Sequence, residues 1–317
     1  MRSRSPSFLL LVVLLVWASG AADSAPLEEP PSTILHAADH AHDSLSRRVI
    51  DLSRWVDSFF GNLPVEEETL GNSVRLAASV EGMETESPAL KLKVSAKLRL
   101  PHFSRRLALV LASFRDEDPA QFGVPGQFAS DEALRLAALR YVVREKKMFR
   151  LQADLGLHFH PEPDLYSRLR ARYQLTEDPV SSRVIQYLFW SHRDGWGETS
   201  RFEMESKIAP KTLARSSTAA TWSEESRGVD WSQGFSAWHS FSTRRAIGLE
   251  WLTEGITDPR LSVEKHRLSF KYRRRVARDW LFIQVGPFIE LPRKRDFEPT
   301  PGITFQVETV FGDTPTY

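Results

Sequence analysis

The sequence predicts an all-β fold, a transmembrane antiparallel up-and-down β-barrel of about 12–14 strands with a short N-terminal amphipathic helix. Three observations predict it: an export signal opens the chain, apolar and polar side chains alternate over most of residues 73–312, and longer connections alternate with tight ones. Composition mainly excludes other classes. A net charge of +1 provides no overall field to attract nucleic acid, and the absence of cysteine excludes disulfides and thiolate metal sites.

Residues 1–22 are predicted to be a secretory signal peptide. Arg2 and Arg4 precede an apolar run from Phe8 to Trp17, and small residues follow at 18–22. A basic start, a short apolar core and a small-residue exit are typical of export signals. The apolar run is too short to span a bilayer as a helix, which takes roughly twenty residues. The mature chain is therefore expected outside the cytoplasm.

Residues 23–72 are predicted to form a periplasmic leader and an amphipathic helix. Between residues 33 and 61, apolar residues recur at helical spacing at Leu45, Val49, Leu52, Val56 and Phe59. Charged residues cover the other side, which indicates a surface helix rather than a spanning one. This helix would plug the barrel, lie in the periplasm or bind a periplasmic partner. His36 and His40 share one side of it, but a solvated polar face is the expected role, and no metal or other cofactor is predicted.

From residue 73 onward the pattern has a period of two. In the clearest segment, Leu92 and Val94 share one face and Lys91 and Lys93 the other, because successive side chains of a strand point to opposite faces. About fourteen such segments follow one another. They cover residues 73–82, 89–100, 105–114, 133–144, 147–160, 164–175, 181–192, 197–209, 211–224, 229–241, 244–255, 262–274, 279–291 and 301–312. Ser and Thr blur the pattern at 211–224 and 229–241, and merging a weak pair would leave twelve strands.

The connections give an independent indication of a membrane barrel. Such barrels have short periplasmic turns and longer external loops. Here the third and thirteenth connections are long, at residues 115–130 and 292–302, whereas most even-numbered ones are tight. The fifth, around 161–163, is short and breaks the rule. This parity places both ends of the barrel in the periplasm. A soluble β-protein is the alternative, but segments of about ten to twelve residues are longer than usual strands and near the length that crosses a bilayer.

The chain resembles Gram-negative outer-membrane β-barrel proteins as a class, with no specific family identified. The resemblance rests on the export signal, the alternating strands and a final strand that ends in an aromatic residue. The residues of that strand that match are Ile303, Phe305, Val307 and Phe311. The resemblance implies an outer-membrane location, contact with outer-membrane lipid, and recognition of the last strand by the barrel-assembly machinery. One departure is the C-terminal tail at residues 313–317.

Aromatic residues should gather at the two interfaces of such a barrel. Several tryptophans lie near predicted strand ends and are compatible with such girdles: Trp190, Trp222, Trp231, Trp238, Trp251 and Trp280.

If the apolar face meets lipid, the polar face lines the lumen. The candidates for an ion path are Lys91, Lys93, Lys97, Arg99, Arg168, Arg170, Arg172, Arg267, Lys271, Arg273, Glu203 and Glu205. These charges would favour the passage of anions, or would form cross-strand ladders that fill and stiffen a closed barrel. The leading hypothesis is a porin-like channel or transporter for small polar or anionic solutes.

Two other functions are weighed beside the channel. One is an outer-membrane lipid-modifying hydrolase. Its candidate residues are His158, or Ser181, Ser182 and His192, or His239 and Ser240. The chain has no G-x-S-x-G elbow, and no catalytic residue is predicted. The other is a structural or assembly barrel that binds a periplasmic partner through the N-terminal helix.

Overall fold

The computed structural model describes residues 73–84, 86–99, 106–112, 136–159, 163–176, 180–193, 195–226, 228–276 and 280–312. The predicted signal peptide, N-terminal helix and C-terminal tail lie outside these ranges. Within them, no helix has the length and apolar character needed to cross a membrane.

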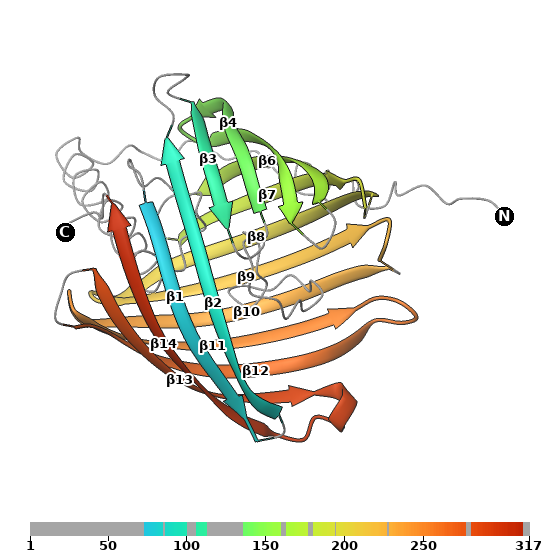
Figure 1. Ribbon diagram of the computed structural model, residues 1–317. Coiled ribbons are helices and arrows are strands. Elements are labelled where there is room, and N and C mark those ends of the chain that lie inside the picture. Colours follow the sequence, from blue (N-terminus) through green and yellow to red (C-terminus); the bar gives the residue numbers. More distant parts are fainter. Residues whose placement is uncertain are drawn as a thin grey trace, which may run out of the picture. The chain divides into compact units, whose positions relative to one another are not determined.

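The described residues form fourteen strands that close into a single antiparallel barrel (Figure 1). The strands are β1 (Ser73–Met83), β2 (Glu86–Arg99), β3 (Leu107–Ala112), β4 (Leu136–Lys146), β5 (Phe149–Phe159), β6 (Pro163–Thr176), β7 (Val180–Ser191), β8 (Gly195–Ala209), β9 (Thr212–Ser223), β10 (Val229–Ser242), β11 (Arg245–Ile256), β12 (Ser262–Arg275), β13 (Leu281–Pro292) and β14 (Thr300–Gly312). A short 3-10 helix, η1 (Arg293–Arg295), follows β13.

Each strand pairs with its neighbours in chain order, and the last strand returns to the first. The closing pair β1–β14 runs in unbroken register from Ser73 opposite Gly312 to Met83 opposite Gly302. Closure leaves no unpaired sheet edge, which is the condition for a sheet to span a lipid bilayer. The predicted barrel is confirmed with fourteen strands, and the twelve-strand alternative is wrong.

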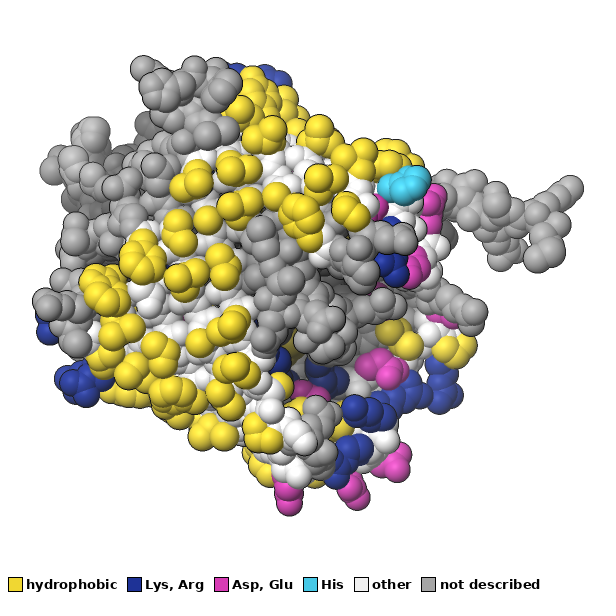
Figure 2. All heavy atoms as spheres, in the orientation of Figure 1, with side chains coloured by type: hydrophobic (Ala, Val, Ile, Leu, Met, Phe, Trp, Pro, Cys, Tyr) yellow, Lys and Arg dark blue, Asp and Glu magenta, His cyan; other side chains and the backbone are white. Residues whose placement is uncertain are grey.

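The two faces of the barrel wall differ sharply in composition. On β6, Leu165 and Leu169 are 46% and 39% exposed, whereas Arg168 and Arg170 are 5% and 4% exposed. Figure 2 shows the outer side of this contrast, with hydrophobic side chains spread over the outer wall of the strands that face the viewer. A soluble protein buries its apolar residues and exposes its charged ones. The reversed distribution suits a barrel with lipid outside and a polar interior.

Aromatic side chains on the inner face cover glycines on the neighbouring strand. Trp238 lies directly opposite Gly248, and Phe288 lies opposite Gly302. A Cβ atom on Gly248 would come within 2.2 Å of the Trp238 ring, and one on Gly302 within 2.3 Å of Phe288. The missing side chain makes room for the ring, a device that pins strand register. Trp238 is fully buried inside the barrel, so its expected place in an interfacial girdle is wrong.

The connections retain the predicted alternation in most places. The longest joins β3 to β4 (113–135), and β9–β10, β11–β12 and β13–β14 at the same end have five to seven residues, whereas two-residue turns follow β4, β8 and β10 at the other end. The connections β2–β3 (100–106) and β12–β13 (276–280) at that other end are longer and break the alternation. The first connection, at residues 84 and 85, is also short. Because Ser73 faces Gly312, the barrel begins and ends at the same end as the two-residue turns. From the usual orientation of such barrels we expect that end to be periplasmic and the other to be external.

Candidate functional site

The inner wall of the barrel is the candidate site. Strand alternation places the predicted lumen residues on the inward face of four strands. These are Lys91, Lys93 and Lys97 on β2, Arg168, Arg170 and Arg172 on β6, Glu203 and Glu205 on β8, and Arg267, Lys271 and Arg273 on β12. Arg99 belongs to β2, but its side chain lies outside the described set. The role of these residues in solute passage stays a prediction.

The first charge cluster joins three consecutive strands around Asp154 of β5. Arg140 of β4 donates two hydrogen bonds to the carboxylate, from Nε at 2.8 Å and Nη2 at 2.9 Å. Arg168 of β6 donates two more, from Nε at 3.1 Å and Nη2 at 2.6 Å. All three side chains are almost fully buried. Charge-assisted contacts of this kind are the strong class of hydrogen bond.

A second cluster continues around the wall on β7, β8 and β9. Arg183 reaches both carboxylates of β8, with Nε 2.5 Å from Glu203 and Nη2 3.0 Å from Glu205. Arg215 of β9 approaches Glu205 from the other side, at 2.7 Å. Arg201 lies 3.7 Å from Glu203. Each of the two glutamates is therefore shared by two arginines.

A third cluster connects strands that are not neighbours. Glu308 of β14 contacts Arg75 of β1 at 3.4 Å and Arg273 of β12 at 3.1 Å, so the second pair passes over β13. Arg267 of β12 lies 3.4 Å from Glu81 of β1 and passes over two strands. Such contacts are possible only on the concave side of the sheet, which independently places these side chains in the interior.

Across the three clusters, a carboxylate is typically flanked by two cations. Asp154, Glu203, Glu205 and Glu308 follow this rule, and Glu81 also contacts Lys91 at 3.6 Å. In the first two clusters the arginines outnumber the carboxylates, which gives these parts of the inner wall an excess of positive charge. Elsewhere the charges are closer to balance, because Arg267 also contacts Glu290 and Lys271 pairs with Glu250. Neutral polar and aromatic side chains also hold the arginines in place. Arg170 donates to Gln152 at 3.3 Å and lies over the Tyr187 ring.

Inward aromatic rings complete the wall beside the arginines. The centre of the Arg267 guanidinium lies 3.8 Å from the Phe288 ring, and that of Arg273 lies 4.5 Å from Phe282. These two phenylalanines interrupt the apolar–polar alternation of β13 in the sequence. The interruption has a physical reason, because planar guanidinium groups stack favourably on aromatic faces.

Sequence reasoning missed several members of the clusters: Arg75, Glu81, Arg140, Arg183 and Arg215. All five stand at inward positions of their strands. Strand parity alone would have assigned them to the interior, whereas their partners depend on register and closure.

The described residues do not assemble the hydrolase considered above. Ser182 lies near the start of β7, whereas His192 follows the last residue of that strand. His239 faces outward and lies 2.9 Å from Thr212 Oγ1, whereas Ser240 is buried on the inner face. The side chain of His158 is outside the described set, and no group of three acidic or histidine residues within that set has the arrangement of a metal site.

No protein-family model matches the chain, and no curated protein matches it. Several solved outer-membrane barrels are similar in structure. A loop-deletion mutant of OmpT from Vibrio cholerae has a TM-score of 0.44 at 12% identity, covering 76% of this chain and 99% of that one. OpdK from Pseudomonas aeruginosa has a TM-score of 0.44 at 9% identity, covering 77% and 98%. The outer membrane channel DcaP of Acinetobacter baumannii has a TM-score of 0.46 at 6% identity, covering 76% and 96%.

Proposed function

We propose that the chain is an outer-membrane channel whose basic lumen favours small anionic solutes. The observation that carries the proposal is the sharing of inner-wall carboxylates between pairs of cations, as at Asp154 and Glu308. A fixed excess of positive charge along a pore attracts anions and repels cations. The outer wall supports the location, because its apolar side chains would be costly in water and are stable in lipid.

Conductance of the purified barrel in a planar lipid bilayer tests the proposal. A salt gradient should give a reversal potential of the sign for anion preference. Replacing Arg168, Arg170 and Arg172 together with Gln should shift that potential toward zero, because the change removes positive charge from one stripe of the inner wall. Arg274→Gln is the matched control, since Arg274 is exposed on the outward face of β12. Absence of conductance would refute the channel, and equal selectivity in both variants would refute the role of these arginines in anion preference.

A closed, braced barrel is the second candidate, and one observation favours it. The ion pairs of Arg267 with Glu81 and of Arg273 with Glu308 connect strands across intervening ones. Such contacts stiffen the wall and occupy part of the interior. In this case Arg267→Gln would lower thermal stability, while the wild-type protein would give no stepwise current.

A further inference from the structure

A pocket of about 530 Å³ lies at the external end of the barrel, apart from the charge clusters of the inner wall. It is formed by the start of β12, the preceding connection at 257–261 and the turn that contains η1. One of its lining residues, His266, shares the outward face of β12 with exposed Phe270. The pocket therefore adjoins the wall that faces lipid.

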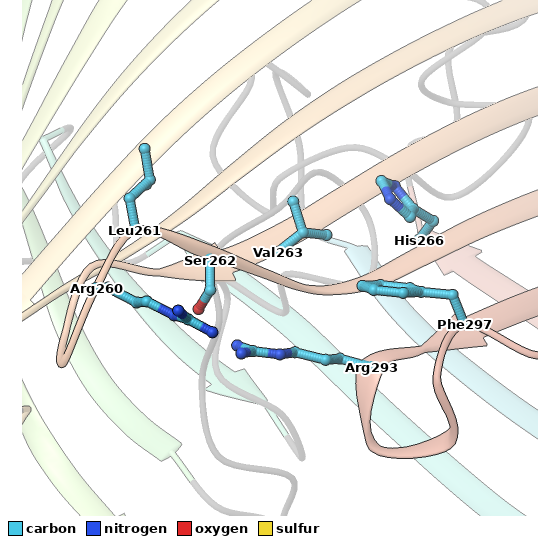
Figure 3. Close-up of a pocket in the computed structure, with 7 residues that line it drawn as sticks. All are labelled: Arg260, Leu261, Ser262, Val263, His266, Arg293 and Phe297. Atoms are coloured by element: carbon cyan, nitrogen blue, oxygen red, sulfur yellow. The ribbon is translucent and has the colours of Figure 1, made fainter.

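Two arginines provide the polar side of the pocket. Arg260 and Arg293 extend toward one another from separate chain segments, with Ser262 beside them (Figure 3). Arg293 Nη1 lies 2.7 Å from Glu264, which also accepts a hydrogen bond from the Ser262 hydroxyl at 3.0 Å. Arg260 makes no ion pair with any residue that the structure describes. Two converging guanidinium groups repel one another unless an anion lies between them, and their planar donors match phosphate oxygens.

The other side of the pocket is apolar and continues onto the outer wall. Leu261 is 73% exposed, and Phe297 stands over His266 with ring centroids 5.7 Å apart. His266 in turn lies 5.5 Å from Trp251, an outward residue of β11. These rings form a continuous aromatic row from the pocket to the apolar belt. A ligand that fills both sides needs an anionic group joined to an apolar body.

The backbone at Phe297 is an independent indication of a binding role. Phe297 and the preceding Asp296 have positive φ angles of 60° and 53°. A bulky side chain is strained in this left-handed conformation, and such strain gathers at ligand clamps. Here the strained turn directs the ring to the pocket.

We propose that this pocket binds the phosphate of a lipid in the outer leaflet. Arg260 and Arg293 would grip the phosphate oxygens, while Phe297 and Leu261 would cover the apolar body. The site lies at the end of the barrel assigned to the external side by its longer connections. The inference requires the barrel to reside in the outer membrane, but it does not require ion conduction, so either idea can fail alone.

Native mass spectrometry of the full chain in a neutral detergent tests the proposal. The probes are lipid A, which carries phosphates on a sugar backbone, its dephosphorylated form, and inorganic phosphate. Wild-type protein should bind lipid A at least about tenfold more tightly than the dephosphorylated form. Arg260→Gln and Arg293→Gln should each weaken lipid A binding by about tenfold, whereas Arg274→Gln should leave it unchanged.

Three results would overturn the assignment. Equal binding of the two lipid forms by wild-type protein would exclude phosphate recognition, and this comparison needs no variant. Equal affinity in wild type and both arginine variants would exclude this pocket. Displacement of lipid A by inorganic phosphate at similar concentration would indicate a free-phosphate site instead. Heat-modifiable gel migration confirms that each variant is folded, and Arg260→Lys provides a milder substitution that retains the charge.

Discussion

The cluster around Asp154 allows the effect of one buried charge to be worked out. Replacing Asp154 with Asn preserves the shape of the side chain but removes its negative charge. Arg140 and Arg168 then face one another across a neutral amide. Four hydrogen bonds of 2.6–3.1 Å lose their charged acceptor, on side chains that are only 3–4% exposed.

The expected destabilisation is about 3 kcal/mol. Removing one partner of a buried ion pair typically costs about 3–5 kcal/mol, because the remaining charge stays buried without compensation. The polar inner wall screens the remaining charges more than an apolar core would, which favours the lower end of that range. Replacing all three residues with apolar side chains of similar size should recover most of the loss, since the desolvation cost disappears together with the attraction.

Urea unfolding of the barrel in lipid vesicles, followed by tryptophan fluorescence, measures the change. Asp230→Asn is the control, because Asp230 is half-buried in β10 and makes no ion pair with a described residue. That substitution should change the free energy of unfolding by less than about 0.5 kcal/mol. A loss for Asp154→Asn of under about 1 kcal/mol would show that the cluster contributes little to stability and would refute the reasoning.

Other predictions address the inner wall, the pocket lined by Arg260 and Arg293, and the final strand. Gly248→Val should destabilise the barrel by about 1–3 kcal/mol in the same unfolding assay, because the new side chain would overlap the Trp238 ring, and Trp238→Leu should recover part of the loss. Phe297→Gly should stabilise the barrel slightly, by about 1 kcal/mol, yet weaken lipid A binding, because glycine accepts the left-handed backbone without strain; equal stability and affinity would contradict this. Phe311→Ala should slow insertion into the outer membrane in a pulse-chase experiment, since Phe311 stacks on the ring of Trp280, whereas deleting residues 313–317 should not.

Most of the strand pattern could be predicted because the outer wall alternates strongly with the inner one. The signal weakens on β9, where Ser216 and Thr218 occupy outward positions instead of large apolar residues. Both are tied to outward Gln233 of β10 by hydrogen bonds. A strand with polar side chains on both faces shows little alternation between apolar and polar residues in the sequence. The strand still forms, because its backbone pairs with a neighbouring strand on each side.

The inner-wall clusters could be predicted only in part. Parity assigns Arg168 and Arg273 to the interior, but their partners depend on register and curvature. Glu308 is 35 residues from Arg273 and 233 from Arg75 in the chain. Contacts over strands such as β13 arise from the bend of the closed wall, which no local pattern encodes. The pocket lined by Arg260 and Arg293 could not be predicted from the sequence either, because its residues come from two separate connections.

The barrel is closed by the pairing of β1 with β14, and this pairing can form only after the last strand has been synthesised. The first strand lacks one of its two partners until the last strand has been synthesised. Lipid does not tolerate unpaired backbone groups, so an incomplete sheet cannot remain stably in the bilayer. Once β1 pairs with β14, Glu308 forms ion pairs with Arg75 and Arg273, and these ion pairs stabilise the closed barrel. Until that moment the chain has to be kept in a form competent for insertion, and the final strand commits it to the membrane.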